Sequence, residues 1–341
     1  MHPPVVRRRW RGRLGLWFGL CGCAQACSGP PGPADVPGKQ GKQAEELPAG
    51  PAPMLAVAAN DATTLGPVDA APSPDGKRIY YLAVSNDGSD QPNAGVFAVD
   101  ADAEGSGEIE ELTSGQPLLT PLGIDSSLDG SALFIADTTA GAGATGALFR
   151  LAAAGGMPST VPGTEGYRPA GLVVSERRGE EVLYFTGHDP ETGEGAVFRI
   201  STGGGEAHRI ASFGADSEPG GVAVAENGEL YVADHAGAGA RVLRVRDEEV
   251  REYVKEIGLG FPAGIALTSD SRTLLISGLD PETKHDVVYS VNLASREIGR
   301  VTQGISAFRE SAGLHRAHDT NVFAWADSQA NDSGTVYTVK F

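Results

Sequence analysis

The sequence predicts an all-β fold, a six-bladed β-propeller of four-stranded blades that occupies residues 53–341. The length of a sequence repeat and the pattern within each copy predict it. A unit of roughly 43 to 54 residues recurs six times, and each copy alternates short apolar segments with tight turns, which is typical of propeller blades. The chain has no cysteine after Cys27, so burial of apolar side chains and closure of the ring must stabilise this region without disulfides.

The typical unit opens with a Pro-x-Gly turn, continues into an apolar strand and then reaches a tight turn. The clearest copy has a first strand at Pro219–Val224, a turn at Asn227 and Gly228, and a second strand at Leu230–Asp234. Asn-Gly and Asp-Gly pairs adopt the positive φ angles that tight hairpins need. The other units begin at Pro67, Pro121, Pro169 and Pro262, and a degenerate copy begins near Ser311.

A second and a third strand follow in every unit, because aromatic and β-branched residues recur there with the period of two that half-buried strands show. The predicted second strands are 79–82, 133–137, 183–186, 230–234, 274–277 and 322–327. The predicted third strands are 96–99, 147–151, 196–200, 241–245, 287–291 and 335–339.

The two ends of the repeat region indicate how the ring closes. The sixth unit stops after its third strand, and an apolar segment, Met54–Ala59, precedes the first unit without a partner of its own. We expect this N-terminal strand, at about residues 54–60, to become the outermost strand of the last blade. Such pairing also removes an exposed strand edge, which is an aggregation risk.

The first 27 residues are typical of an export signal. Five arginines precede an apolar run, Leu14–Leu20, which is too short to span a bilayer as a helix. All three cysteines follow this run, and Leu20–Cys23 resembles the lipobox of bacterial lipoprotein signals. We expect Cys23 or Cys27 to carry the lipid, and the alternative is plain secretion with Ala24–Ala26 as the cleavage site.

Residues 28–52 are rich in glycine, proline and alanine and show no hydrophobic period, which predicts a disordered tether. The expected location is therefore the cell envelope, as an outer-membrane lipoprotein or as a periplasmic or secreted protein. The formal net charge of −17 disfavours nucleic-acid binding, since phosphate backbones would be repelled. We expect a monomer that contacts the membrane only through its lipid.

The repeats resemble those of the NHL, SMP-30 and TolB-like six-bladed propellers. Pro219–Asp234 is similar to the Pro-x-Gly and Leu-Tyr-Val-Ala-Asp pattern of that group, and Pro72–Lys77 resembles the TolB version of the turn. The resemblance implies a fold and not an activity. Members of the SMP-30 type are metal-dependent lactonases, and resemblance to them would imply an ion held at the channel by one Glu, two Asn and one Asp.

The channel positions of this sequence depart from that ligand set. The turn residues expected to face the channel contain no carboxylate or amide: Val68, Leu122, Ala170, Gly220, Ala263 and Ala312. Polar or bulky residues stand one place earlier or close by, and these are the channel-mouth candidates: Arg168, Glu218, Phe261, Glu310, Asp69 and His315. No catalytic residue is assigned, and a bound metal remains an open question.

The loops after the second strands are expected on the same face as the Pro-x-Gly turns, and they carry a second set of candidates. These loop-face residues are Asp137, His188, Asp189, Asp234, His235 and Asp327. Histidines and carboxylates together are ligands for a transition metal, although short Asp- and Gly-rich loops are more often simple turns.

Two functions follow from these observations. The first is a non-catalytic envelope propeller without a cofactor, which binds a protein, peptide or glycan partner through its loop face. The alternative is a metal-dependent hydrolase or lactonase of the SMP-30-like type, with a divalent cation such as Ca²⁺ as its cofactor.

Overall fold

The computed structural model describes residues 54–341 except 61–62, 87, 89–92, 103–106, 142, 238, 256, 261, 281–285, 302–310 and 331–332. All described residues belong to one compact unit, Ala49–Phe341. The predicted signal, the lipid-bearing cysteines and the tether lie outside the described residues. Among the described residues, no helix has the length and apolar character that a membrane span requires.

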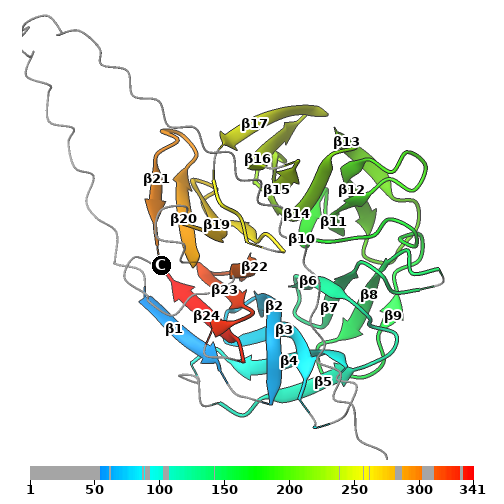
Figure 1. Cartoon of the computed structure of the whole chain (residues 1–341), viewed down its shortest axis with the longest axis vertical. Helices are drawn as coiled ribbons and strands as arrows, with labels where there is room; N and C mark the ends of the chain where they lie inside the picture. The colour runs from blue at the N-terminus through cyan, green and yellow to red at the C-terminus, as the bar shows by residue number, and fades with distance from the viewer. Residues whose placement is uncertain are drawn as a thin grey trace, which may run out of the picture. The chain divides into compact units, whose positions relative to one another are not determined.

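The strands form six four-stranded antiparallel sheets, the blades of a β-propeller, which confirms the predicted fold (Figure 1). Blade 1 consists of β2 (Thr64–Pro72), β3 (Arg78–Ser85), β4 (Ala94–Asp100) and β5 (Glu110–Ser114). Blade 2 consists of β6 (Pro121–Ser126), β7 (Ala132–Asp137), β8 (Ala147–Ala152) and β9 (Ser159–Thr160). Blade 3 consists of β10 (Leu172–Arg177), β11 (Glu180–His188), β12 (Gly195–Ser201) and β13 (His208–Gly214).

The second half of the ring repeats this arrangement. Blade 4 consists of β14 (Ser217–Val224), β15 (Leu230–Ala236), β16 (Gly239–Arg246) and β17 (Glu249–Lys255). Blade 5 consists of β18 (Ile265–Leu267), β19 (Thr273–Leu279), β20 (Asp286–Asn292) and β21 (Ile298–Arg300). Blade 6 consists of β22 (Ser311–Arg316), β23 (Val322–Asp327), β24 (Thr335–Lys340) and β1 (Met54–Ala59).

The ring closes as predicted. Strand β1 pairs antiparallel with β24, so that Leu55 lies opposite Val339 and Val57 opposite Tyr337 (Figure 1). The innermost strand of each blade contacts the innermost strands of both neighbouring blades, including β22 with β2. The last blade is therefore assembled from the two ends of the propeller sequence.

The core lies between adjacent blades. Phe134 and Leu148 of blade 2 pack with Leu172, Phe185 and Phe198 of blade 3 in one buried cluster. The rings of Phe185 and Phe198 stack with their centroids 5.2 Å apart. Each sheet buries both of its faces against its neighbours, which is why the second and third strands are apolar along almost their whole length.

The repeated glycine of the Pro-x-Gly motif has a packing reason. A Cβ atom on Gly264 would lie 2.1 Å from the backbone nitrogen of Leu314, and one on Gly171 would lie 2.4 Å from the carbonyl oxygen of Gly220. The innermost strands thus approach the next blade too closely for a side chain. Blade 1 is the exception, because the residue at this point of its motif is Asp69.

Candidate functional site

Asp69 is a buried carboxylate that joins three blades. It accepts hydrogen bonds from the backbone N–H groups of Ala70 and Ile124, both at 2.8 Å. The Nε2 atom of His315, on β22, lies 3.0 Å from its second oxygen. Asp69 and His315 retain only 2% and 7% of their accessible surface, so they lie inside the ring and not at its mouth.

Two opposing effects act on the pKa of His315. Burial by itself lowers it, but the negative charge of Asp69 and the hydrogen bond to that carboxylate outweigh burial and raise the pKa from 6.5 to about 9. His315 is therefore protonated at neutral pH, and the two side chains form a buried ion pair.

Asp125 has a similar role one blade further round the ring. Its carboxylate accepts hydrogen bonds at 2.8 Å from the backbone N–H groups of Ser126 and of Val174 in blade 3. The Nε2 atom of His318, in the turn after β22, lies 3.8 Å from Asp125 and donates to the carbonyl oxygen of Ser126 at 2.8 Å. The channel acids are thus bonded to the edges of neighbouring blades and to histidines.

The remaining channel-mouth candidates are not brought together with this pair. Glu218 lies 3.4 Å from the Nε2 atom of His188, and Arg168 adopts a left-handed φ of 46° in its turn. Phe261 and Glu310 lie outside the described residues. Within the described part of the chain, no group of three or more His, Cys, Asp or Glu side chains is placed to hold a metal ion.

The loop-face aspartates organise their own loops. Asp137, which is fully buried, accepts hydrogen bonds from the backbone N–H groups of Leu119, Thr120, Thr139 and Ala140.

Three further loop-face aspartates also form hydrogen bonds or ion pairs with nearby groups. Asp234 pairs with Arg241, with Nη2 and Oδ2 at 2.8 Å, and Asp189 pairs with Arg209 at 2.8 Å. Asp327 accepts from the backbone N–H of Ala330 at 2.9 Å. These carboxylates stabilise loop conformation through the bonds that they make.

His188 and His235 flank Glu218, which lies opposite His235 in the pairing of β14 with β15. Burial is the largest influence on His235 and lowers its pKa, against the nearby charges of Asp234 and Glu218. At neutral pH this favours an uncharged imidazole.

A large cavity lies on the other face of the ring. We call the face that carries the hairpin turns between first and second strands the turn face, and the face that carries the loops between second and third strands the loop face. The cavity has a volume of about 1180 Å³ and is lined by the turn-face hairpins of blades 3, 4 and 5, together with Arg316–Asp319 of blade 6. It reaches Asp125 and the predicted channel candidate His315, and it lies on the face opposite the predicted loop-face candidates.

Between blades 3 and 4 the cavity forms a groove. Its floor is the upper edge of the core cluster between these blades, where Val222 and Leu230 are buried and Val173 and Val224 are partly exposed. Tyr184 closes one side. The groove can therefore cover apolar groups while its rim remains in water.

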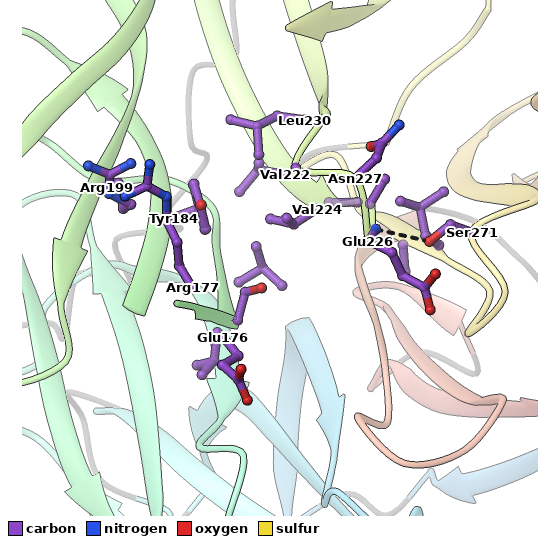
Figure 2. Close-up of a pocket in the computed structure, with 18 of the residues that line it drawn as sticks. Glu176, Arg177, Tyr184, Arg199, Val222, Val224, Glu226, Asn227, Leu230 and Ser271 are labelled. Atoms are coloured by element: carbon purple, nitrogen blue, oxygen red, sulfur yellow. Dashed lines mark hydrogen bonds between the residues drawn. The ribbon is translucent and has the colours of Figure 1, made fainter. Parts of the chain in front are cut away.

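The two walls of the groove carry opposite charge. The blade 3 wall has Glu176 and three arginines, Arg177, Arg178 and Arg199, and the blade 4 wall has Glu226 and the hairpin Asp247–Glu248. Figure 2 shows Arg177, Tyr184 and Arg199 together on one side, with Glu226, Asn227 and Ser271 on the other. The site is bipolar, with an apolar floor between the walls.

Sequence reasoning missed this site because it followed acidic and histidine residues and not the turn-face hairpins. One signal was available: blades 1 and 2 have Asp-Gly in the first hairpin, whereas blade 3 has Arg177-Arg178-Gly179 there. Paired arginines in a strongly acidic chain are unusual. The groove is lined by residues of different blades, and a repeat pattern does not show which of them meet in space.

Comparisons with known proteins show similarity of fold alone. No protein-family model matches the chain, and no curated protein sequence matches it either. A protein of unknown function from Dyadobacter fermentans DSM 18053 is structurally similar, with a TM-score of 0.60 and 10% identity over 85% of this chain and 98% of that one.

A putative TolB from Agrobacterium tumefaciens is similar with a TM-score of 0.52 and 14% identity, over 82% of this chain and 90% of that one. The hydrazine synthase of Kuenenia stuttgartiensis gives 0.50 and 13% identity, over 83% of this chain and 88% of that one. The chain is thus a β-propeller with a TolB-like structural neighbour, and propellers of this shape also occur in enzymes.

Proposed function

We propose that the chain is a non-catalytic binding propeller of the cell envelope, which receives a peptide segment of a protein partner in the turn-face groove. The observation that carries this proposal is the groove itself, a cavity of about 1180 Å³ with an apolar floor and walls of opposite charge. Polar rims around an apolar centre are typical of protein recognition sites.

The proposal moves binding from the predicted loop face to the turn face. The loop-face carboxylates Asp137, Asp234 and Asp327 are buried and engaged in their own loops. Arg177, Arg178 and Glu226 are instead solvent-accessible at the groove. Free polar groups on a rigid scaffold can exchange water for a partner without breaking bonds of the fold.

Export and lipid attachment belong to the same proposal. A lipid on Cys23 or Cys27 and a tether of about 25 residues would hold the propeller near a membrane, while leaving its groove open to other envelope proteins. The alternative metal-dependent hydrolase has no comparable support, because Asp69 and Asp125 already accept hydrogen bonds from neighbouring blades.

A selection of random displayed heptapeptides on the purified protein tests the proposed groove. We expect enriched peptides whose binding falls at least about tenfold in Val224→Arg, which fills the groove floor with a charged side chain. Glu191→Arg, an exposed loop-face change, should leave their affinity unchanged. Peptides that respond to Glu191→Arg and not to Val224→Arg would place the site on the loop face and contradict the proposal.

A further inference from the structure

Arg199 is one of the three arginines of the blade 3 wall. It lies opposite Tyr184 in the pairing of β11 with β12, and opposite His208 in the pairing of β12 with β13. Its side chain is partly buried and lines the cavity. No ion pair links its guanidinium to a carboxylate of the described residues, although the chain has a net charge of −17. An arginine that lines a cavity without a carboxylate partner is available to bind one that a ligand supplies.

Blade 4 shows the same arginine with its carboxylate in place. Arg244 lies opposite Tyr231, as Arg199 lies opposite Tyr184. Glu229 accepts two hydrogen bonds from Arg244, at 3.0 Å from Nε and at 2.5 Å from Nη2. The hydrogen bond from Arg244 is also the main reason why the pKa of Glu229 is lowered.

The residue of blade 3 that corresponds to Glu229 is Val182. Glu229 immediately precedes Leu230, which lies opposite Val245 on the third strand, and Val182 immediately precedes Leu183, which lies opposite Ile200. Both residues are 7% exposed. Blade 3 thus presents a Tyr–Arg pair of the same geometry without an internal carboxylate, and this pair opens into the groove.

Neighbouring charges strengthen the preference for an anion. Arg177 lies on the same side of the groove as Arg199 and Tyr184 (Figure 2), and Arg178 follows it in the hairpin. A carboxylate that enters the groove along this wall is attracted by these cations. The planar fork of an arginine binds a carboxylate through two parallel hydrogen bonds.

We propose that Arg199, on the same wall as Arg177, is a carboxylate-binding subsite for an acidic side chain or a C-terminal carboxylate of the peptide in the groove. The inference rests on the proposed function, because the groove must first hold a peptide. Apolar side chains next to that carboxylate pack on Val222, Val224 and Leu230. The preferred ligand is therefore an acidic residue, or a chain end, flanked by apolar residues.

The test uses soluble synthetic forms of the peptides selected above, each with a free or amidated C-terminus and with each Asp or Glu in turn replaced by its amide. We expect Arg199→Leu to weaken the acidic peptide by about ten- to a hundredfold and to leave the amide form unchanged. Val182→Glu should do the same, because it supplies the internal carboxylate that Glu229 provides in blade 4. Loss of affinity on amidation of the C-terminus would identify the chain end as the carboxylate source.

Arg150→Leu is the matched control, since Arg150 occupies the corresponding position of blade 2, opposite Phe134, and does not line the cavity. This substitution should leave the affinity for both the acidic and the amide peptides unchanged. Peptides that need the groove, as judged by Val224→Arg, but bind Arg199→Leu and Val182→Glu as well as the unchanged protein would overturn the subsite and leave the proposed function intact. A selection without groove-dependent peptides would overturn both.

Discussion

Asp69 and His315 show how one departure from a repeat acquires a structural role. Five blades have glycine at this point of the Pro-x-Gly motif, and a Cβ atom on Gly313 would collide with the Asp69 side chain. The carboxylate fills the space beside that glycine and bonds to blades 2 and 6 at once. The pair therefore stabilises the junction between the first and the last blade.

The ion pair predicts a particular dependence of stability on pH. Because the pKa of His315 rises from 6.5 to about 9 on folding, its contribution is complete below pH 6.5 and disappears as the pH rises through about 9. His315→Gln should therefore cost on the order of 3 kcal/mol in the free energy of unfolding at pH 6 and far less at pH 9.5. Urea unfolding of both proteins at the two pH values measures this, and a difference that does not change with pH would show that the pair is not ionic.

At the scale of the strand and hairpin, the repeat pattern predicted most of the fold. The second and third strands of all six blades and the pairing of Met54–Ala59 with the last blade are confirmed, because these strands are apolar and bounded by turns. The buried bridge between Asp69 and Ile124 could not be predicted, since it joins residues of two different blades. The groove could not be predicted either, since residues of different blades line it.

Closure by β1 predicts the effect of removing it. A chain that begins at residue 61 loses the buried Ala58 and Ala59 and leaves the edge of β24 unpaired. We expect its melting temperature to fall by on the order of 10 °C and dimers or aggregates to appear in size-exclusion chromatography. A chain that begins at residue 49 should melt like the whole protein.

A synthetic peptide of residues 53–60 provides the specific control, because it can add to the free edge of β24 as the missing strand. It should restore the melting temperature of the shortened chain, and a scrambled peptide should not. If the shortened chain melts at the same temperature as the whole protein, β1 does not hold the ring closed.

At the scale of the whole molecule, the chain is strongly acidic, yet no group of three or more metal-ligating side chains lies together among the described residues. The channel carboxylates Asp69 and Asp125 are satisfied by backbone N–H groups and histidines. We expect elemental analysis to find no stoichiometric divalent ion, and EDTA to leave the melting temperature unchanged. A bound ion whose removal lowers the melting temperature would instead support the hydrolase alternative and direct mutagenesis to Glu218, Glu310 and Asp69.

The two faces of the propeller make the central claim directly testable, because each carries an exposed glutamate: Glu226 on the groove rim and Glu191 on the loop face. A photo-crosslinking amino acid at either position, in the cells that produce the protein, reports which face a partner occupies. We expect one discrete adduct from position 226, its loss in Val224→Arg, and none from position 191. An adduct from position 191 alone would contradict the assignment of the turn-face groove as the binding site.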